Sequence, residues 1–530
     1  CLVGSEMCIR DSYMTFEIVF VLLSLLGMVA ALVADKMRPG MILFSVVVLF
    51  LCAGILTPKE MLEGFSNKGM ITVALLFLVS EGIRQSGTLG QVIKKLLPQG
   101  KTTVFKAQLR ILPSVAFISA FLNNTPVVVI FAPIIKHWAK SVNLPATKFL
   151  IPLSYVTILG GICTLIGTST NLVVHGMILE AGFEGFSMFE LGKVGIFIAI
   201  AGIIYIFLFS KRLLPDARPD TAVPDEEVEE GEKLHRVEAV LGARFPGINK
   251  KLKDFNFQRH YGAEVKEIKT RNGQRFVTNL DDVVLHEGDT LVVMADDTFI
   301  PTWGESSVFV LLTNGNEPDT TGKKKRWFAL LLLVLMIVGA TVGELPVTKE
   351  MFPDIKLDMF FFVSITTIIM AWTNLFPARK YTKYISWDIL ITIACAFAIS
   401  KAMVNSGVAD SVAKFIIGLS DDYGPHVLLA MLFIITNLFT ELITNNAAAA
   451  LAFPLALSIA SQLGVSPTPF FVVICMAASA SFSTPIGYQT NLIVQGIGNY
   501  KFTDFVRIGL PLNIITFLIS IILIPLIWNF

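Results

Sequence analysis

The stretch LNNTPVVVIFAP, at positions 122–133, recurs as ITNNAAAALAFP at positions 443–454. Both copies place an Asn-rich polar turn before an apolar run that ends in proline. Two further pairs of segments keep the same order and the same separation of about 320 positions: TNLVVHG (170–176) with TNLIVQG (490–496), and SGTLGQVIKKL (86–96) with SGVADSVAKFI (406–416). Three ordered matches at one separation predict that the two halves of the chain are structural repeats.

The composition is that of a membrane protein. Of 530 residues, 54% are hydrophobic and only 16% are charged, and the mean hydropathy is +0.69. A soluble protein carries about 25% charged residues. Long apolar runs alternate with short charged connectors, and residues 215–322 alone have a soluble composition. The pattern excludes a single soluble enzyme and predicts a membrane bundle with a soluble insert. The net charge of +1 gives no indication of a nucleic-acid partner.

Each half contains six apolar segments when a crossing is taken as about 20 residues. They are residues 16–34, 41–56, 71–97, 111–135, 149–179 and 194–209, then 327–342, 359–376, 389–417, 427–459, 470–498 and 505–527. A polar turn interrupts the fourth segment of each half, so we predict a re-entrant hairpin there. Five crossings then remain in each half, and an odd number inverts the second repeat relative to the first. The predicted fold is an all-α polytopic membrane protein of two inverted repeats, with a small α+β domain between them.

Lys and Arg residues set the predicted orientation. They gather in connectors on one side of this topology, for example around residues 94–110 and 323–326, and are sparse on the other. Because cytoplasmic connectors carry the excess of positive charge, we predict a multi-pass protein of the plasma (inner) membrane. The central domain is then cytoplasmic and both termini lie outside.

The sequence divides into four parts. Residues 1–13 fit nothing downstream, and we predict that they are a non-native leader. Residues 14–212 and 323–530 are the predicted membrane repeats, and residues 213–322 are the soluble domain with its linkers. An acidic, proline-rich linker opens this domain, and alternating strands follow, joined by turns at Asn272–Gly273 and residues 287–289. We therefore predict a compact α+β module.

Polar breaks interrupt the hairpins and the long segments 149–179 and 470–498. In hydrocarbon such breaks are tolerated only inside protein or beside water. Helix N-termini at a break favour an anion, while unwound carbonyls and Asn or Thr oxygens favour Na⁺. Four paired breaks therefore predict one anion site flanked by two cation sites. The alternative is that any single Asn or Thr merely joins helices by hydrogen bonds.

Other polar residues in or near apolar segments receive no assigned role. They are Glu81, Arg84, Lys401, Glu441 and His175, the last being the counterpart of Gln495. Interface anchoring or an ion pair explains the charged ones as well as function does.

These motifs resemble the divalent anion:sodium symporter family over about residues 16–210 and 326–528. That family carries Ser-Asn-Thr at each hairpin tip, where this chain has residues 123–125 and 444–446; the middle Asn is kept in both, as Asn124 and Asn445. VVLHEGDTLVVMA (283–295) resembles a TrkA-C regulatory domain, and TPIGYQTNLIVQG (484–496) resembles the branch that carries this insert. The resemblance implies a homodimer and an elevator-like movement of the hairpin-bearing domain. For residues 235–296 it implies a regulatory or dimerisation role, with a small ligand as a candidate partner; the alternative is that this domain is a structural spacer.

The leading hypothesis is Na⁺-coupled symport of a small divalent anion, either sulfate or a C4-dicarboxylate. The predicted substrate-binding residues are Asn124, Thr125, Thr170, Asn445, Asn446 and Thr490. The predicted cation-binding residues are Asn123, Asn124, Gly167, Thr168, Asn171, Thr444, Asn445, Gly487 and Asn491. Two alternatives remain open: a proton-coupled or oxyanion efflux carrier, and a nutrient sensor that signals through the central domain. The sequence shows no nucleophile–base pair that would indicate an enzyme.

Overall fold

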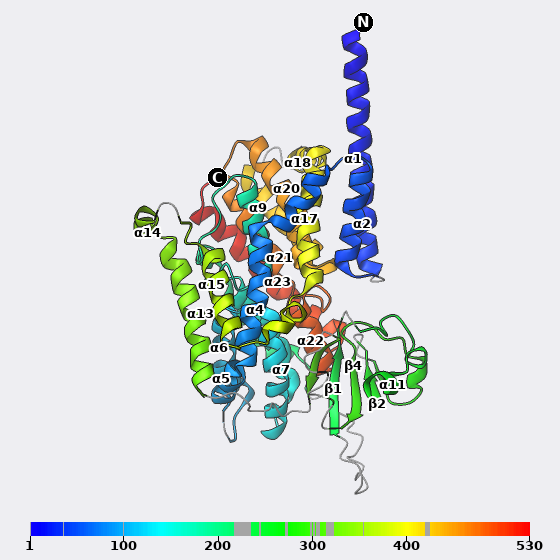
Figure 1. The fold of residues 1–530 in the computed structure, drawn as a ribbon, viewed down its shortest axis with the longest axis vertical. Helices are drawn as coiled ribbons and strands as arrows, with labels where there is room; N and C mark the ends of the chain where they lie inside the picture. The colour runs from blue at the N-terminus through cyan, green and yellow to red at the C-terminus, as the bar shows by residue number, and fades with distance from the viewer. Residues whose placement is uncertain are drawn as a thin grey trace.

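The computed structural model is a helical body with a small sheet at one end (Figure 1). It describes residues 2–34, 37–98, 100–216, 235–242, 245–270, 274–296, 299, 303, 308–313, 323–352, 355–418 and 424–530. The predicted acidic linker, apart from its first residues, and the predicted Asn272–Gly273 turn lie outside these ranges.

The helices of the first half are α1 (Leu2–Ala34), α2 (Pro39–Cys52), α3 (Pro58–Glu63), α4 (Lys68–Gln85), α5 (Thr88–Leu96), α6 (Val104–Ser119), α7 (Asn124–Ser141), α8 (Leu150–Gly161), α9 (Ser169–Glu180) and α10 (Gly192–Leu213). Those of the second half are α13 (Lys323–Gly343), α14 (Pro346–Met351), α15 (Met359–Trp372), α16 (Tyr381–Tyr384), α17 (Trp387–Asn405), α18 (Val408–Gly418), α19 (Gly424–Leu442), α20 (Asn445–Leu463), α21 (Thr468–Ser479), α22 (Gln489–Gly498) and α23 (Phe502–Ile527).

Seven described helical spans are long and apolar enough to cross a membrane, which confirms a multi-pass membrane protein. Five shorter apolar helices accompany them, among them α8 and α21. These two are short because each ends at a predicted break, where the chain leaves the helix before starting α9 or α22. The prediction of interrupted segments is therefore confirmed at both places.

The two halves interlock as inverted repeats. Helix α4 packs against α15 and α17 packs against α2; likewise α7 packs against α22 and α20 against α9. Each of these contacts joins one half to the other and has a counterpart with the roles exchanged. Helices α5 and α7 reach the end that carries the sheet, whereas α18 lies at the opposite end (Figure 1). The inverted-repeat prediction is confirmed.

Two predicted crossings are each split into two helices. The apolar stretch 71–97 becomes α4 and α5, and 389–417 becomes α17 and α18. The chain turns at Gly87 and Gly407, whose φ angles are +69° and +75°. Glycine adopts this left-handed conformation without the steric cost that a side chain would add. Polar residues mark both turns, Arg84–Ser86 before Gly87 and Asn405–Ser406 before Gly407. The prediction of one segment was wrong at both places because it joined the apolar residues on the two sides of each turn.

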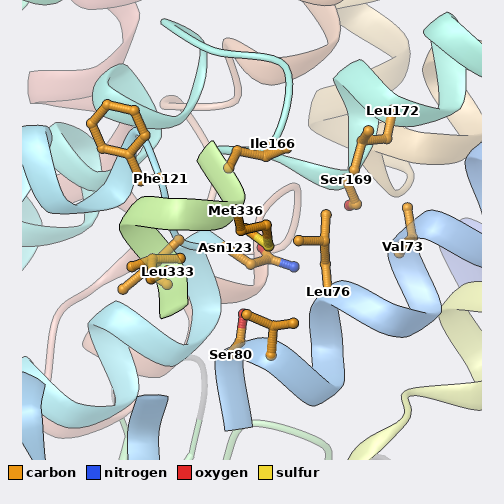
Figure 2. Close-up of a pocket in the computed structure, with 12 residues that line it drawn as sticks. Val73, Leu76, Ser80, Phe121, Asn123, Ile166, Ser169, Leu172, Leu333 and Met336 are labelled. Carbon is orange, nitrogen blue, oxygen red and sulfur yellow. The ribbon is translucent and has the colours of Figure 1, made fainter. Parts of the chain in front are cut away.

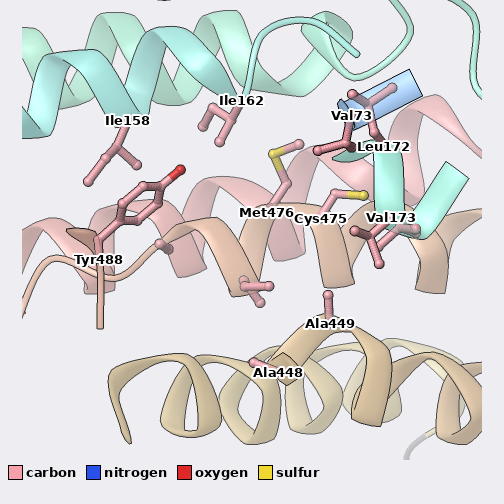
Figure 3. Packing of buried hydrophobic residues seen from close by; sticks show 14 of the residues in the cluster. Val73, Ile158, Ile162, Leu172, Val173, Ala448, Ala449, Cys475, Met476 and Tyr488 are labelled. Atoms are coloured by element: carbon pink, nitrogen blue, oxygen red, sulfur yellow. The ribbon is translucent and has the colours of Figure 1, made fainter. Parts of the chain in front are cut away.

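Small residues allow close packing beneath the breaks. Ala448 and Ala449 on α20 face α21, where Cys475 and Met476 are fully buried (Figure 3). Without a large hydrophobic driving force between helices in lipid, such close contacts supply much of the stabilisation. Helices α6 and α7 are the arms of the first hairpin, and α19 and α20 are the arms of the second. The arm α20 is thereby held against α21, the helix that ends at the break before α22.

The soluble domain is a five-stranded antiparallel sheet in the order β3-β2-β4-β1-β5. The strands are β1 (His235–Leu241), β2 (Glu264–Lys269), β3 (Arg275–Phe276), β4 (Thr290–Ala295) and β5 (Phe309–Thr313), with the short helix α11 (Phe257–Tyr261) beside them. Alternating residues such as Val237, Ala239 and Leu241 form the buried face. The predicted α+β module is confirmed, and the predicted turn at residues 287–289 contains Gly288 with φ +84°.

Candidate functional site

Four helices begin at the four predicted breaks: α7, α9, α20 and α22. Their N-cap residues, Asn123, Thr168, Thr444 and Tyr488, are all described, and none caps its helix with a side-chain hydrogen bond. The first N–H groups of each helix thus lack a side-chain acceptor, and each N-terminus carries a partial positive charge. The site is built from helix starts rather than from charged side chains.

Tyr488 joins the first hairpin tip to two breaks, the first at residues 162–168 between α8 and α9 and the second at residues 480–488 between α21 and α22. The Asn124 amide oxygen accepts from the Tyr488 hydroxyl at 2.5 Å, and the amide nitrogen donates to the carbonyls of Gly167 (3.2 Å) and Thr157 (3.1 Å). The Tyr488 hydroxyl also lies 3.0 Å from Thr168 Oγ1. The first hairpin tip, the first break and the second break therefore share one hydrogen-bond network.

The second hairpin tip joins the same network. Thr170 Oγ1 donates to Asn446 Oδ1 at 3.2 Å, and Ser169 Oγ donates to the same oxygen at 3.3 Å. On the other side, Thr125 Oγ1 donates to Gln489 Oε1 at 3.2 Å. Each hairpin tip thus contacts the break of the opposite repeat. The structure brings together these predicted site residues: Asn124, Thr125, Thr168, Thr170 and Asn446.

Each break is held in shape by one threonine. Thr164 Oγ1 accepts from the N–H of Gly167 at 3.2 Å, and Thr484 Oγ1 accepts from the N–H of Gly487 at 3.2 Å. Both hydroxyls also donate to a backbone carbonyl at the end of the first hairpin arm. The two threonines are 320 positions apart, so the same geometry recurs in both repeats. These buried bonds satisfy unwound backbone that lipid would not tolerate.

Three predicted ligands serve this scaffold. Asn171 and Asn491 each donate from Nδ2 to the carbonyl seven residues earlier, at 2.9 and 3.1 Å. The Ser154 hydroxyl contacts both Asn491 Oδ1 (2.7 Å) and Thr490 Oγ1 (2.9 Å). All three predicted residues are at most 1% exposed. Their positions support the breaks directly, whereas Asn171 Oδ1 has no partner among the described residues.

Two hydroxyls that sequence reasoning missed lie beside the hairpin asparagines. Ser119 Oγ lies 2.8 Å from the Asn124 amide, and Thr440 Oγ1 donates to Asn445 Oδ1 at 3.2 Å. In both hairpins the residue with the hydroxyl lies five positions before the asparagine. Ser119 and Thr440 are 321 positions apart, which is the separation of Asn124 and Asn445. Extending the repeat alignment toward the N-terminus would have found this pair. Tyr488 was missed because its counterpart is the unlike residue Thr168.

A small cavity adjoins the first hairpin tip (Figure 2). Asn123 lines it from the tip, Ser80 from α4 and Ser169 from the start of α9, with apolar side chains such as Leu76 and Met336 around them. Its volume of about 10 Å³ is the room that one water molecule needs. The cavity places a water-sized space between the tip, the first break and the neighbouring α4 and α13.

The atoms that could coordinate a cation at the hairpin tips and breaks are the oxygens of hydroxyl, amide and carbonyl groups. Within the described ranges, no group of three or more His, Cys, Asp or Glu side chains is arranged to hold a metal ion. The hydroxyl, amide and carbonyl oxygens at each break are hard ligands of the kind that coordinate Na⁺ in broken-helix transporters. Thr444 Oγ1, at the second tip, is buried without a partner in the described part of the chain.

Comparison with known proteins agrees with this architecture. A sequence model described as citrate transporter (CitMHS) matches residues 29–463 and 355–529. An uncharacterized transporter of Synechocystis sp. is 30% identical over 91% of this chain and 93% of its own length. In Chlamydomonas reinhardtii, a putative sulfur deprivation response regulator is 28% identical over 90% of this chain and 96% of its own. A probable sodium/sulfate cotransporter 3 of the same alga is 23% identical over 91% and 85%.

These matches extend over both membrane repeats and agree with the resemblance to divalent anion:sodium symporters. They also exclude an enzyme, since the family is one of transporters. The chain belongs to the citrate transporter family, CitMHS, and is an anion transporter of the membrane.

Proposed function

We propose that the protein is a Na⁺-coupled symporter of a small divalent anion, sulfate or a C4-dicarboxylate. One observation carries this proposal: the starts of α7, α9, α20 and α22 meet in a hydrogen-bond network at the two hairpin tips. Helix N-termini favour an anion without a charged side chain. The relative named as a sodium/sulfate cotransporter supports both the ion and the substrate class.

The substrate would sit against the polar side chains at these helix starts. Thr125 and Ser169 are half-buried and Gln489 is exposed, so they face the accessible side of the network. Asn124 and Asn446 lie behind them and are buried. Hydroxyl and amide donors then supply the hydrogen bonds, and the helix ends supply the positive potential. In this arrangement Thr490 supports the site through Ser154 rather than meeting the substrate.

Two cation sites would flank the substrate. The Ser119 hydroxyl and the Gly167 carbonyl lie together beside the Asn124 amide in the first repeat. A bound Na⁺ would be met by the amide oxygen once the amide rotates, because the nitrogen faces this space when no cation is bound. Thr440 and Asn445 form the equivalent pair in the second repeat, and Gly487 stands where Gly167 does. A bound Na⁺ beside each hairpin tip would offset the charge of a divalent anion. Binding of ion and substrate would therefore be mutually favourable, which is the physical basis of symport.

Other parts of the hypothesis rest on the family resemblance and the charge pattern. We propose a homodimer in the plasma (inner) membrane, with the sheet domain in the cytoplasm and an elevator-like movement of the hairpin-bearing domain. We also propose a regulatory ligand at residues 235–296, as in TrkA-C domains.

Proton coupling is the second candidate, and Glu441 favours it. This carboxylate lies in the hairpin arm α19, where it accepts from the Ser483 N–H (2.9 Å) and from Asn513 Nδ2 (2.8 Å). Its counterpart in the first repeat is Ala120. A carboxylate within a membrane segment is a candidate proton carrier. Its place beside the second break would link its charge to the second hairpin tip.

Uptake by purified protein in liposomes tests the proposal. With an inward Na⁺ gradient we expect labelled sulfate or succinate to accumulate at least about tenfold faster than with K⁺, because the cation sites need Na⁺ to fill. A proton gradient imposed in the absence of Na⁺ should drive little uptake. Uptake that follows the proton gradient would favour the Glu441-based carrier. Substrate binding without any flux under either gradient would contradict transport and favour a sensor.

A further inference from the structure

The soluble domain is attached to the membrane region by a partly buried ion pair, whose Lys136 and Glu238 side chains are 22% and 17% exposed. Lys136, near the end of α7, contacts both carboxylate oxygens of Glu238 on β1 at 2.9 Å. Lys269 on β2 lies 3.5 Å from the same carboxylate and is itself 3% exposed. Ion pairs shielded from solvent are costly to break, because one charge is then left buried without a partner. The pair therefore fixes the sheet to the hairpin arm.

A second contact joins the sheet to α22. Gly288, in the turn before β4, faces the Leu492 side chain so closely that a Cβ there would lie 2.6 Å from it. On the helix side, a Cβ at Gly496 would lie 2.6 Å from Thr290 Oγ1 and 3.1 Å from the Gly288 carbonyl. Glycine on both surfaces lets the two backbones approach. Turn and helix therefore fit together as tightly as parts of one core.

The two helices that the sheet contacts are those that start at the candidate site. From Asn124 to Lys136 is 12 residues of α7, or about 18 Å at 1.5 Å per residue. From Gln489 to Gly496 is 7 residues of α22, or about 10 Å. At the site end the helices are joined by the hydrogen bond from Thr125 to Gln489. The sheet joins them again at the far end, so the pair is fastened at both ends.

The Glu238 carboxylate of this ion pair stays ionised at neutral pH. Burial by itself would raise the pKa of Glu238, but the charges of Lys136 and Lys269 outweigh it and lower the pKa to about 2. A lowered folded-state pKa contributes stability that is present above the unfolded value of about 4.5 and is lost only as the pH falls toward 2. Neutral conditions therefore leave the attachment intact.

We propose that the soluble domain is a rigid part of the hairpin-bearing half and moves with α7 and α22 during transport. This inference rests on the proposed transport function. Its consequence is mechanical: any ligand that alters the sheet acts on two of the four helices that form the site. The opposite arrangement, a stationary domain that α7 and α22 slide past, would need to break both the ion pair and the glycine contact in every cycle.

A disulfide between β4 and α22 tests the proposal. A Cβ at Gly496 lies 4.0 Å from Thr290 Cβ, within the range of about 3.5–4.5 Å that a disulfide spans. In a background without native cysteines, Thr290→Cys with Gly496→Cys should cross-link on oxidation and retain uptake within about twofold of the reduced protein. Uptake that stops on oxidation and returns on reduction would overturn the proposal, as would failure to cross-link. Absence of uptake in the reduced variant and its parent would instead count against the proposed function.

A matched pair of charge reversals gives a second test that needs no cross-link. Lys136→Glu places a carboxylate opposite Glu238, whereas Lys140→Glu makes the same change one turn on, at an exposed position of α7. We expect Lys136→Glu to accelerate hydrogen exchange in β1 and in α22 together, and Lys140→Glu to leave both unchanged. Equal exchange in the two variants, or a change in β1 that leaves α22 unaffected, would contradict rigid attachment.

Discussion

Uptake should fall by at least about tenfold when Asn124 or Asn445 is replaced by alanine. Asn124 is 1% exposed, and its amide joins the Tyr488 hydroxyl to the carbonyls of Gly167 and Thr157. Leaving a buried hydrogen-bonding group without its partner costs about 1–3 kcal/mol, and each 1.4 kcal/mol is tenfold in an equilibrium constant. Asn445 holds the equivalent place beside Thr440. The loss should appear in transport measured at equal amounts of reconstituted protein.

A control separates loss of the site from loss of folding. Asn405 bonds to the Ile55 carbonyl at 3.2 Å and to Glu60 at 3.0 Å, away from both hairpin tips. Asn405→Ala removes an amide of the same size, and it should keep uptake within about twofold of the unmodified protein. Full activity in both Asn124→Ala and Asn445→Ala would contradict the site. Equal losses in all three variants would show that the effect is structural.

Adding one methyl group at Gly161 or Gly487 should also nearly abolish uptake. A Cβ at Gly161 would lie 2.5 Å from the nearer atom of the Asn124 amide group, its nitrogen in this orientation, and 3.1 Å from the Gly167 carbonyl. A Cβ at Gly487 would overlap Ser481 Oγ and lie 2.5 Å from the Thr440 carbonyl. Real Cβ atoms do not approach so closely, so the hairpin tip must move away from the break. A shift of about 1 Å in such a site costs on the order of a hundredfold in rate.

The same substitution elsewhere provides the comparison. Gly418, at the end of α18, has no atom within 4 Å of an added Cβ. Gly418→Ala should therefore leave both uptake and thermal stability unchanged. Gly161→Ala should lower uptake on the order of a hundredfold while the protein still elutes as a folded species in detergent. Normal uptake in Gly161→Ala and in Gly487→Ala would mean that the tips and breaks need not touch.

The repeats and breaks could be predicted because both are written in local sequence. An Asn-rich turn within an apolar run has no satisfactory place in lipid, and its recurrence about 320 residues later fixes the symmetry. The turn at Gly87, which divides α4 from α5, was missed although Arg84, Gln85 and Ser86 precede it. Apolar residues resume beyond the turn, so the two helices were taken as one segment. Contacts between the halves, such as Thr170 with Asn446, depend on how the repeats interlock and have no local signal.

Asymmetric features were the least predictable. Tyr488 bridges two breaks, yet the equivalent position of the first repeat is Thr168, so a search for paired residues passes over it. Glu441 was passed over in the same way, because its counterpart in the first repeat is Ala120. Symmetry is a guide to the shared framework, whereas the chemistry that distinguishes one hairpin from the other lies where the repeats differ.

The attachment of the soluble domain also depends on tertiary structure. In the sequence, Lys136 is one of several basic residues near the end of an apolar segment. Glu238 is one polar position in a strand of alternating residues. They meet only because the sheet seats against the ends of α7 and α22. The functional meaning of both residues comes from this docking and not from their own neighbourhoods.

An experimental structure of the protein with Na⁺ and sulfate would test the central claim most directly. The account predicts anion density at the meeting point of the starts of α7, α9, α20 and α22, within hydrogen-bonding distance of Thr125 or Asn446. It also predicts a cation beside Asn124 and another beside Asn445. Anion density bound elsewhere, with the two hairpin tips apart and their polar groups facing other helices, would contradict the account.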